Sequence, residues 1–381
     1  MRLRSLWVCL RALLIASIVA RAEAQAPDTV LIGFAAPLTG PSAGDGKEME
    51  NAVRLAIDDA NARHPAINGH PIRFEIDAQD DEGDPRIATQ VAQRLVDRKA
   101  AGVVGHFNSS CSIAASATYH SAATAEVSPS STNAAYTLQG YNTTFRVVGQ
   151  DAMAGRALGQ YLVTLPGNRR FAIVDDRSDF GQGLADRVQQ TVIEEHGTVV
   201  GREFVTSKTI DFSAVLTKIR ALQADVIVFG GFDAQAGQFV RRMRSLGLQS
   251  TLAGEGLNNS IFTTMAQGDG DGSVSVQPGR PLDQMPGKGF FNRYESRFGQ
   301  SLQGFQAPYA YDAASVIIEA VLAAQSSEPS RVLSAVENTR LDGITGPLSF
   351  DAHGDLTNSP YTLYRLDKGR WTAVQTTTGA H

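Results

Sequence analysis

Two clusters of hydroxyl-bearing residues each follow a short apolar run in the first third of the chain. GHFNSS (105–110) follows AAGVV, and SPSSTN (128–133) follows a short run that ends near Val127. If these runs are strands that lead into helices, the first backbone N–H groups of each helix have no acceptor and bind anions well. The pattern therefore predicts a carboxylate site built by Ser109, Ser110, Ser130, Ser131 and Thr132. Ordinary helix capping by serine is the simpler alternative.

Aromatic residues and an acid occupy comparable positions further along the chain. Phe180 follows the apolar run RFAIVDD, Phe232 follows DVIVF, and Glu255 follows STLA. With Phe107, the phenylalanines can line a small pocket in which Glu255 pairs with an ammonium group. Charge-assisted hydrogen bonds of this kind contribute roughly 1.5 to 3 kcal/mol each. The combination fits a zwitterion, while core packing of the phenylalanines and a solvated Glu255 are the alternatives.

These clusters lie at the ends of predicted strands. Apolar runs rich in Val, Ile and Phe alternate with helix-length segments, and the rhythm restarts after about Val148, which indicates two α/β halves with parallel sheets covered on both faces. Ligands of such sheets bind beyond the carboxyl ends of the strands. We expect strands at 29–36, 72–78, 101–105, near 127, and at 170–176, 198–205, 225–231 and 250–253, and helices at 47–62, 86–99, 151–165, 181–197 and 212–222.

The first 24 residues have the composition of a secretory signal peptide. Arginines at 2, 4 and 11 accompany an apolar run at 12–20, and Ala22 and Ala24 form an A-x-A cleavage pattern. Cleavage after Ala24 removes four arginines and one glutamate, so the 381-residue chain of net charge −5 becomes 357 residues of net charge −8.

Cys111 is the only cysteine of the mature chain, so we expect an apolar core without disulfides. This length favours two domains.

Several classes of function receive no support. An acidic, exported chain is a poor candidate for binding nucleic acid or anionic lipid. The sequence has no G-x-S-x-G, H-E-x-x-H or P-loop motif, and GQGLAD (181–186) breaks the dinucleotide pattern at its last glycine position. Cys111 with His106 or His120 is less plausible as a nucleophile pair than Cys111 as a packing residue. DGDG (269–272) lacks two positions of a calcium loop. We expect no enzyme, no cofactor and no metal.

Landmarks over nearly the whole mature chain together resemble those of the periplasmic branched-chain amino-acid-binding proteins of the leucine/isoleucine/valine type. These landmarks are APLTGP (36–41), DDEGDP (80–85), VGHFNSS (104–110), SPSSTN (128–133), DFGQGLA (179–185), FGGFDAQAGQ (229–238), GEG (254–256) and ITGPLSFDAHGDL (344–356). The resemblance implies the α/β type I periplasmic binding fold, with two Rossmann-like lobes joined by three crossover segments. We expect lobe 1 at 28–147 and 278–350, and lobe 2 at 148–277 and 351–381.

The resemblance also implies roles for single residues. Ser109 and the backbone near Phe107 would hold the carboxylate of the ligand, Ser130 (mainly through its backbone) and Thr132 would share the carboxylate and ammonium, and Glu255 would receive the ammonium. Phe180 and Phe232 stand where leucine-type relatives often have tyrosine. Asp45 lies about where relatives place an aromatic residue against the ligand side chain, although it is equally well placed to cap the following helix. Where some relatives have a disulfide, this chain has Gly83 and Asn108.

The expected function is therefore capture of a free amino acid, branched-chain or otherwise neutral, by a monomer in the periplasm. The protein would deliver it to the permease subunits of an ATP-driven (ABC) importer in the inner membrane, after closing its two lobes around the ligand. The alternative is a binding or sensing protein of the same fold for an amide, a urea or an aromatic acid.

Overall fold

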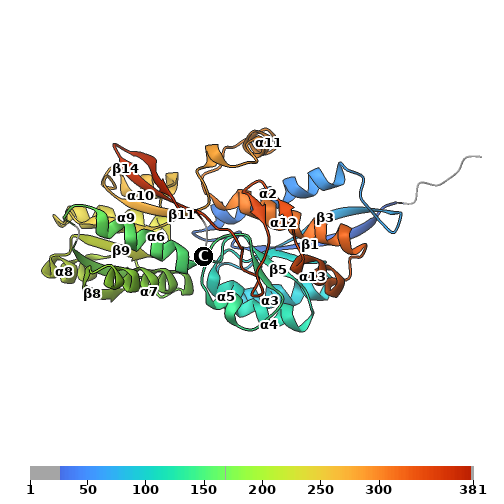
Figure 1. Ribbon diagram of the computed structural model, residues 1–381, viewed down its shortest axis with the longest axis horizontal. Helices are drawn as coiled ribbons and strands as arrows, with labels where there is room; N and C mark the ends of the chain where they lie inside the picture. Colours follow the sequence, from blue (N-terminus) through green and yellow to red (C-terminus); the bar gives the residue numbers. More distant parts are fainter. Residues whose placement is uncertain (1–25, 168, 379–381) are drawn as a thin grey trace, which may run out of the picture.

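The computed structural model describes residues 26–167 and 169–378, so the expected signal peptide lies outside the described residues. Two sheets, each flanked by helices, form two bodies side by side (Figure 1). Within the described residues the first sheet has the order β2-β3-β1-β4-β5-β6. Its strands are β1 (Asp28–Ala36), β2 (Ala66–Ile67), β3 (His70–Asp80), β4 (Val103–Gly105), β5 (Glu126–Ser128) and β6 (Thr144–Arg146).

The first sheet is parallel except for the short β2, which pairs antiparallel with β3. Strand β1 is buried on both faces: Ile32 and Phe34 lie in one core cluster, and Ala35 lies in the cluster on the opposite side. This explains its nearly continuous apolar sequence. The helices of this body are α2 (Ala43–Asn61), α3 (Pro85–Asp97), α4 (Ser109–Ser121), α5 (Ala135–Leu138), α11 (Gly289–Phe298), α12 (Gln306–Ala324) and α13 (Pro329–Glu337).

The second sheet has the order β15-β14-β11-β10-β9-β7-β8. Its five parallel strands are β7 (Arg170–Asp175), β8 (Thr198–Phe204), β9 (Val226–Gly230), β10 (Thr251–Glu255) and β11 (Val274–Pro278). The hairpin of β14 (Tyr361–Asp367) and β15 (Arg370–Thr376) completes it and runs antiparallel to β11. The expected parallel strands thus form the centre of this sheet, and the hairpin adds an antiparallel edge that the sequence did not indicate. The helices of this body are α6 (Asp151–Thr164), α7 (Asp179–Glu194), α8 (Ser213–Leu222), α9 (Asp233–Ser245) and α10 (Ser260–Ala266).

The chain passes between the two sheets three times. The first passage joins β6 to α6, and the second follows β11 and includes the 3-10 turn η1 (Leu282–Gln284). The third passage precedes β14, after the two-stranded pair β12 (Leu341–Asp342) and β13 (Pro347–Leu348). Each body is therefore made of segments that are far apart in the sequence.

Helix α12 is long and apolar enough to cross a membrane by length and composition, with a mean hydropathy of 1.2. In this fold 67% of it is buried inside the protein, and residues such as Ile317 and Val321 belong to the core beside β1. Its composition therefore reflects its place in the core of the first body.

Helix starts differ from those expected in two places, and both concern glycines. Helix α2 begins at Ala43 and not at residue 47, and its Gly46 lies so close to the carbonyl of Pro37 that a Cβ atom would approach that oxygen to 1.9 Å. Helix α7 begins at Asp179 and not at 181, because Ser178 caps it by accepting a hydrogen bond from Gly181 N (3.0 Å). It ends at Glu194, and His196 rather than Gly197 has a positive φ (63°). These glycines permit close packing inside helices and do not mark loops.

Candidate functional site

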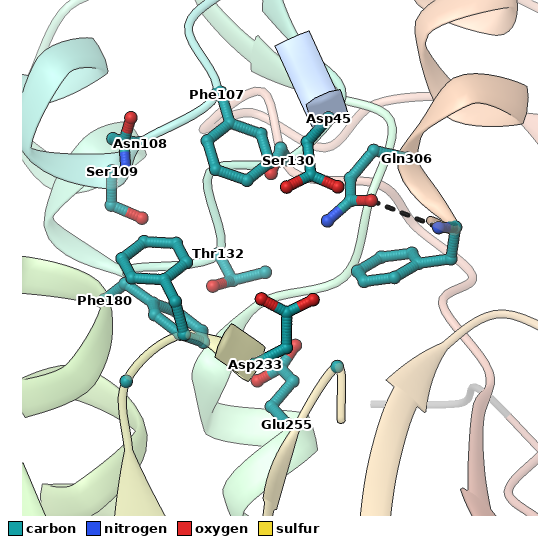
Figure 2. A pocket seen from close by; sticks show the side chains of 14 residues that line it. Asp45, Phe107, Asn108, Ser109, Ser130, Thr132, Phe180, Asp233, Glu255 and Gln306 are labelled. Atoms are coloured by element: carbon teal, nitrogen blue, oxygen red, sulfur yellow. Dashed lines mark hydrogen bonds between the residues drawn. The ribbon is translucent and has the colours of Figure 1, made fainter. Parts of the chain in front are cut away.

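A pocket lies between the two bodies, beyond the carboxyl ends of strands from both sheets (Figure 2). Its empty volume, including the part that opens to solvent, is about 540 Å³. Eight of the ten residues that the sequence indicated for a ligand site lie on its wall: Asp45, Phe107, Ser109, Ser130, Thr132, Phe180, Phe232 and Glu255.

One wall of the pocket is the N-terminus of helix α4. Asn108 precedes the helix but makes no side-chain capping bond, and the amides of Cys111 and Ser112 both donate to the carbonyl of Asn108. Within the described residues, the amides of Ser109 and Ser110 have no backbone acceptor. Free amides at the positive end of a helix dipole attract an anion. This end of the pocket is therefore suited to a carboxylate.

The loop after β5 supplies Ser130 and Thr132, but not every predicted hydroxyl faces the pocket. Ser131 is fully buried, and its hydroxyl lies 2.8 Å from that of Ser112. Ser110 Oγ accepts a hydrogen bond from Asp179 N (3.2 Å) in the other body. The hydroxyl of Ser131 thus holds the loop, the hydroxyl of Ser110 joins the two bodies, and neither residue lines the pocket.

The backbone of Ser130 is less free than expected. Its amide donates a long hydrogen bond (3.3 Å) to the hydroxyl of Ser128, which also accepts from Ser131 N (2.9 Å). The hydroxyl of Ser128 in turn donates to the carbonyl of His106 (3.0 Å). The two loops that carry the hydroxyl residues are thus held to each other behind the pocket.

Three phenylalanines form an aromatic wall that crosses from one body to the other. The rings of Phe107 and Phe232 stack at 5.9 Å, and those of Phe180 and Phe232 meet at 5.4 Å. Phe180 lies in the first turn of α7, and Phe232 is the N-cap residue of α9. Both were expected in loops, but their position at helix starts still directs them into the pocket. Such a wall suits an aliphatic or aromatic group of a ligand.

Glu255 is the last residue of β10 and is 4% exposed. Its Oε2 atom is buried without a hydrogen-bond partner. Burial, followed by the charge of Asp151, raises the pKa of Glu255 well above its usual value. Burial also raises the pKa of Asp151 to about 7, although Thr132 and Arg146 offset part of the effect. A buried carboxyl group that lacks a partner is a site for a cationic group.

Asp45 does not cap helix α2, since it lies within the first turn and Ser42 precedes the helix. Its side chain extends into the pocket opposite Asp233 and Glu255 (Figure 2). Burial raises the pKa of Asp45 to about 7, and the charges of Asp233 and Glu48 add to this effect. Burial also raises the pKa of Asp233. Asp45 therefore lies on the pocket wall and is not the capping residue of α2.

Sequence reasoning missed several residues on the pocket wall. These are Asn108, Gly231, Asp233, Gly256, Phe305 and Gln306. Asp233 follows Phe232 directly and was within reach of the same argument. Phe305 and Gln306 begin α12, which follows no strand of either sheet, so no strand-end pattern pointed to them.

Arg146 holds the loop behind the pocket in place. This fully buried residue donates from Nη1 to Ser131 O (2.7 Å), and from Nη2 to Asn133 O (3.0 Å) and to Thr137 Oγ1 (2.8 Å). Its Nε atom lies 2.6 Å from Oδ1 of Asp355, on the third passage between the sheets. A single guanidinium therefore connects the pocket loop to the crossover region.

The two bodies touch each other at the rim of the pocket. Asn133 Nδ2 donates to Asp179 O (2.5 Å), and Asp179 N donates to Ser110 Oγ. Ser260 Oγ also donates to Gln303 Oε1 on the opposite side of the pocket. Together with the stack of Phe107 on Phe232, these contacts describe a closed arrangement.

Cys111 is a buried residue of α4, as expected, and burial raises the pKa of its thiol. The ring of His106 lies between Asp81 Oδ2 (2.6 Å) and Tyr119 OH (3.2 Å), and His120 stacks on Tyr141. A Cys–His nucleophile pair has no support in this arrangement. No group of three or more metal-binding side chains occurs among residues 26–167 and 169–378.

Comparison with known proteins connects this geometry to a family. Residues 29–370 match the family described as periplasmic binding protein. A leucine-, isoleucine-, valine-, threonine- and alanine-binding protein of Pseudomonas aeruginosa is 30% identical over 346 residues, which covers 90% of this chain and 91% of that protein. An amino acid binding protein of the same organism is 33% identical over 347 residues and covers the same shares of the two chains.

Solved structures share the fold. A leucine binding protein of Thermotoga maritima superposes with a TM-score of 0.83 at 21% identity, over 91% of this chain and 98% of that one. A solute binding protein of R. palustris in complex with benzoate superposes with a TM-score of 0.81 at 19% identity, over 93% and 97% of the two chains.

Proposed function

The chain belongs to the periplasmic binding protein family, and on this basis we propose that it captures a free amino acid between its two lobes and delivers it to an ABC importer. The observation that carries the proposal is the bipolar pocket. Free amides at the start of α4 lie on the first body, while the buried, unpartnered Glu255 lies on the second. A molecule with a carboxylate and an ammonium group matches both ends. Relatives with amino acids in their names support this class of ligand.

We assign the roles of the pocket residues as follows. Ser109 and the backbone near Phe107 bind the carboxylate of the ligand, Glu255 binds the ammonium, and Ser130 and Thr132 bind between the two groups. Phe107, Phe180 and Phe232 cover the side chain of the ligand, and Asp45 lies at its far end. We place lobe 1 at 28–147 and 278–356 and lobe 2 at 148–277 and 361–378, which moves the third boundary from the expected position between 350 and 351. The hydrogen bond from Thr137 to Asp355 (3.0 Å) and the packing of Leu356 in the first core support a third crossing at 357–360 rather than at 351.

The proposed mechanism is closure driven by differential contact. In an open form the ligand reaches the groups of one lobe only, while in the closed form it also contacts Glu255, Phe180 and Phe232 of the other. A ligand shifts the equilibrium toward closure by the free energy of these additional contacts. The closed shape is then the form that the permease subunits recognise. We further propose that the mature chain acts as a monomer in the periplasm and performs no catalysis.

A second candidate is a binding or sensing protein for an aromatic acid. The aromatic wall and the similarity to a benzoate complex favour it. A benzoate-like ligand has a carboxylate but no ammonium, so it would leave Glu255 without a partner. The two candidates therefore differ in their dependence on Glu255.

The test is a ligand screen on the mature protein and on Glu255→Gln. We expect free amino acids to raise the Tm of the unaltered protein, and we expect Glu255→Gln to weaken their binding by about 2 to 5 kcal/mol in calorimetry, because a buried ion pair is lost. An aromatic acid that binds equally well to both proteins would establish the second candidate instead. No Tm shift with any amino acid would contradict the proposal.

A further inference from the structure

The proposed function uses one of the three carboxyl groups in the pocket. Glu255 is paired with the α-ammonium group, and Asp45 and Asp233 are left. None of the residues that line the pocket is Lys, Arg or His. An amino acid with a neutral side chain would therefore leave two acids without a counter-charge in a closed, partly apolar pocket, which is unfavourable.

Asp45 is free to bind a ligand. Within the part of the chain that the structure describes, no group donates a hydrogen bond to its carboxylate. The acid one turn later, Glu48, is fully engaged, because its two oxygens accept from Gln303 N (2.8 Å) and Gly304 N (3.0 Å). The close approach of Gly46 to Pro37 fixes the first turn of α2, and hence the position of Asp45. Asp45 is thus a positioned acid without a partner.

Asp233 lies on the other lobe, in the first turn of α9, and its orientation is also fixed. Its Oδ1 accepts from Ala234 N (2.7 Å), and its Oδ2 accepts from Asn259 Nδ2 (2.6 Å). The side-chain oxygen of Asn259 caps α10 by accepting from Phe262 N (2.9 Å), so its NH₂ group is directed at Asp233. Donors that hold a carboxylate in this way favour its charged form. Asp233 is therefore a preorganised acid that faces the pocket.

We propose that the ligand is an amino acid whose side chain carries a second positive charge, and that Asp45 and Asp233 hold this ammonium or guanidinium group between the lobes. The inference rests on the proposed function and names its class of substrate. Glu255, with its separate unpartnered oxygen, remains the site of the α-ammonium. The three phenylalanines cover the aliphatic stem that joins the two cationic groups.

This arrangement couples selectivity to closure. Asp45 comes from the first lobe and Asp233 from the second (Figure 2), so they approach each other when the cleft closes. Their repulsion opposes closure around a neutral side chain, and a cation between them turns this repulsion into attraction. The same pair thus favours the cationic ligand and disfavours its neutral analogue, which is an effective route to specificity.

The test compares matched pairs of ligands by calorimetry on the mature full-length protein. L-lysine is compared with L-norleucine, which lacks the side-chain amine, and L-arginine with L-citrulline, which replaces the guanidinium by a neutral urea group. We expect the cationic member of at least one pair to bind at least tenfold more tightly. Equal or tighter binding of both neutral analogues overturns the inference.

Two variants assign the effect to the residues. Asp45→Asn and Asp233→Asn are each expected to reduce the preference for the cationic ligand at least tenfold, because the affinity for the cationic ligand falls and the affinity for its neutral analogue rises. Asp58→Asn, on the same helix as Asp45 but exposed and paired with Arg297, is the matched control and is expected to keep the preference. An unchanged preference in both pocket variants also overturns the inference.

The outcomes separate this inference from the proposed function. Binding of leucine or norleucine without a preference for lysine or arginine leaves the proposed function in place and removes the inference. Binding of no amino acid of either kind removes both. The ligand comparison on the unaltered protein is decisive even if a variant fails to fold.

Discussion

At the scale of single residues, the pocket holds carboxyl groups in surroundings that disfavour their charge. Asp45, Asp233 and Glu255 all have a raised pKa, and in each case burial is the largest cause. A ligand-free closed cleft therefore bears an electrostatic cost that grows as these acids ionise. The proposed ligand would remove this cost, because its positive charges would neutralise these acids.

Asp45 predicts a pH dependence of stability. Its pKa is about 7 in the closed protein and near 3.8 when unfolded, so the folded protein holds more protons between these values. The contribution of Asp45 to stability is then lost as pH rises toward and through about 7. We expect the Tm of the ligand-free protein to fall between pH 5 and pH 8 by a few degrees more in the unaltered protein than in Asp45→Asn.

The test compares the fall of Tm with pH in the unaltered protein and in Asp45→Asn. Other acids with a raised pKa, such as Asp312, contribute equally to this fall in both proteins, so only the difference reports on Asp45. Parallel curves for the unaltered protein and Asp45→Asn in differential scanning calorimetry would contradict the burial of Asp45 in the closed cleft.

At the scale of elements, the pocket depends on the loop after β5, which Arg146 holds in place by hydrogen bonds to its backbone. Residues Ser130 and Thr132 lie on the connection after β5, and Arg146 at the end of β6 binds the carbonyls of Ser131 and Asn133. Asp355 balances the charge of the guanidinium. Loop residues in binding sites need support of this kind, since their own backbone forms no sheet or helix.

Replacing Arg146 tests this support. We expect Arg146→Met to lower the free energy of unfolding by about 3 to 5 kcal/mol, since Asp355 is left buried without a counter-charge. Ligand affinity is expected to fall as well, because the loop loses its anchor. Urea denaturation and calorimetry measure the two effects.

The double variant Arg146→Met/Asp355→Leu should recover part of the stability but not the affinity. Arg86→Met, which breaks an exposed ion pair with Asp84, serves as the control and should cost less than about 1 kcal/mol. A loss of stability in Arg146→Met no larger than in this control would contradict the proposed anchoring.

The elements also show how far the sequence predicts the fold. The alternation of apolar runs and helical segments predicted the parallel strands and the α/β class. The helix expected at 86–99 is α3, which begins at Pro85 after the capping residue Asp84, whose Oδ1 accepts from Arg86 N (2.8 Å). The start of α2 at Ala43 was missed because local propensity penalises glycine, whereas close packing of Gly46 against Pro37 requires it. The start of α7 at Asp179 was expected two residues late, at Gly181. The hairpin β14–β15 carried no strand–helix rhythm and was not predicted.

The pocket residues were predictable to the extent that they follow strands. Residues after β4, β5, β9 and β10 reach the pocket because parallel strands end at one edge. Phe305 and Gln306 reach the pocket because of where α12 packs in the folded protein, and the local sequence does not indicate this position.

At the scale of the whole molecule, the two lobes are held together by a small set of contacts around the pocket. Helices α4 and α7 meet through Asp179, whose amide donates to Ser110 and whose carbonyl accepts from Asn133. Ser110 lies outside the pocket wall. Opening of the cleft would break these contacts between the two bodies, so we expect them to contribute to ligand affinity without touching the ligand.

Ser110→Ala isolates this contribution. We expect it to weaken ligand binding by about five- to tenfold, the equivalent of one hydrogen bond of about 1 kcal/mol. Small-angle scattering should show a smaller radius of gyration for the ligand-saturated protein than for the ligand-free one, with the variant needing more ligand for the same change. The control is Ser121→Ala at the far end of α4, whose hydroxyl donates only to Ala117 O. Superimposable titrations of Ser110→Ala and the unaltered protein would exclude a role of this contact in closure.

The late position of α12 in the chain has a consequence for the order of folding during synthesis. All strands of the first sheet are made by residue 146, but the helix that supplies Ile317 and Val321 to its core follows only after the five parallel strands of the second sheet. The first sheet therefore exposes the apolar face that α12 later covers, while the strands of the second sheet can already assemble from neighbouring segments. The body whose synthesis began first thus keeps part of its core uncovered while the five parallel strands of the second sheet are made.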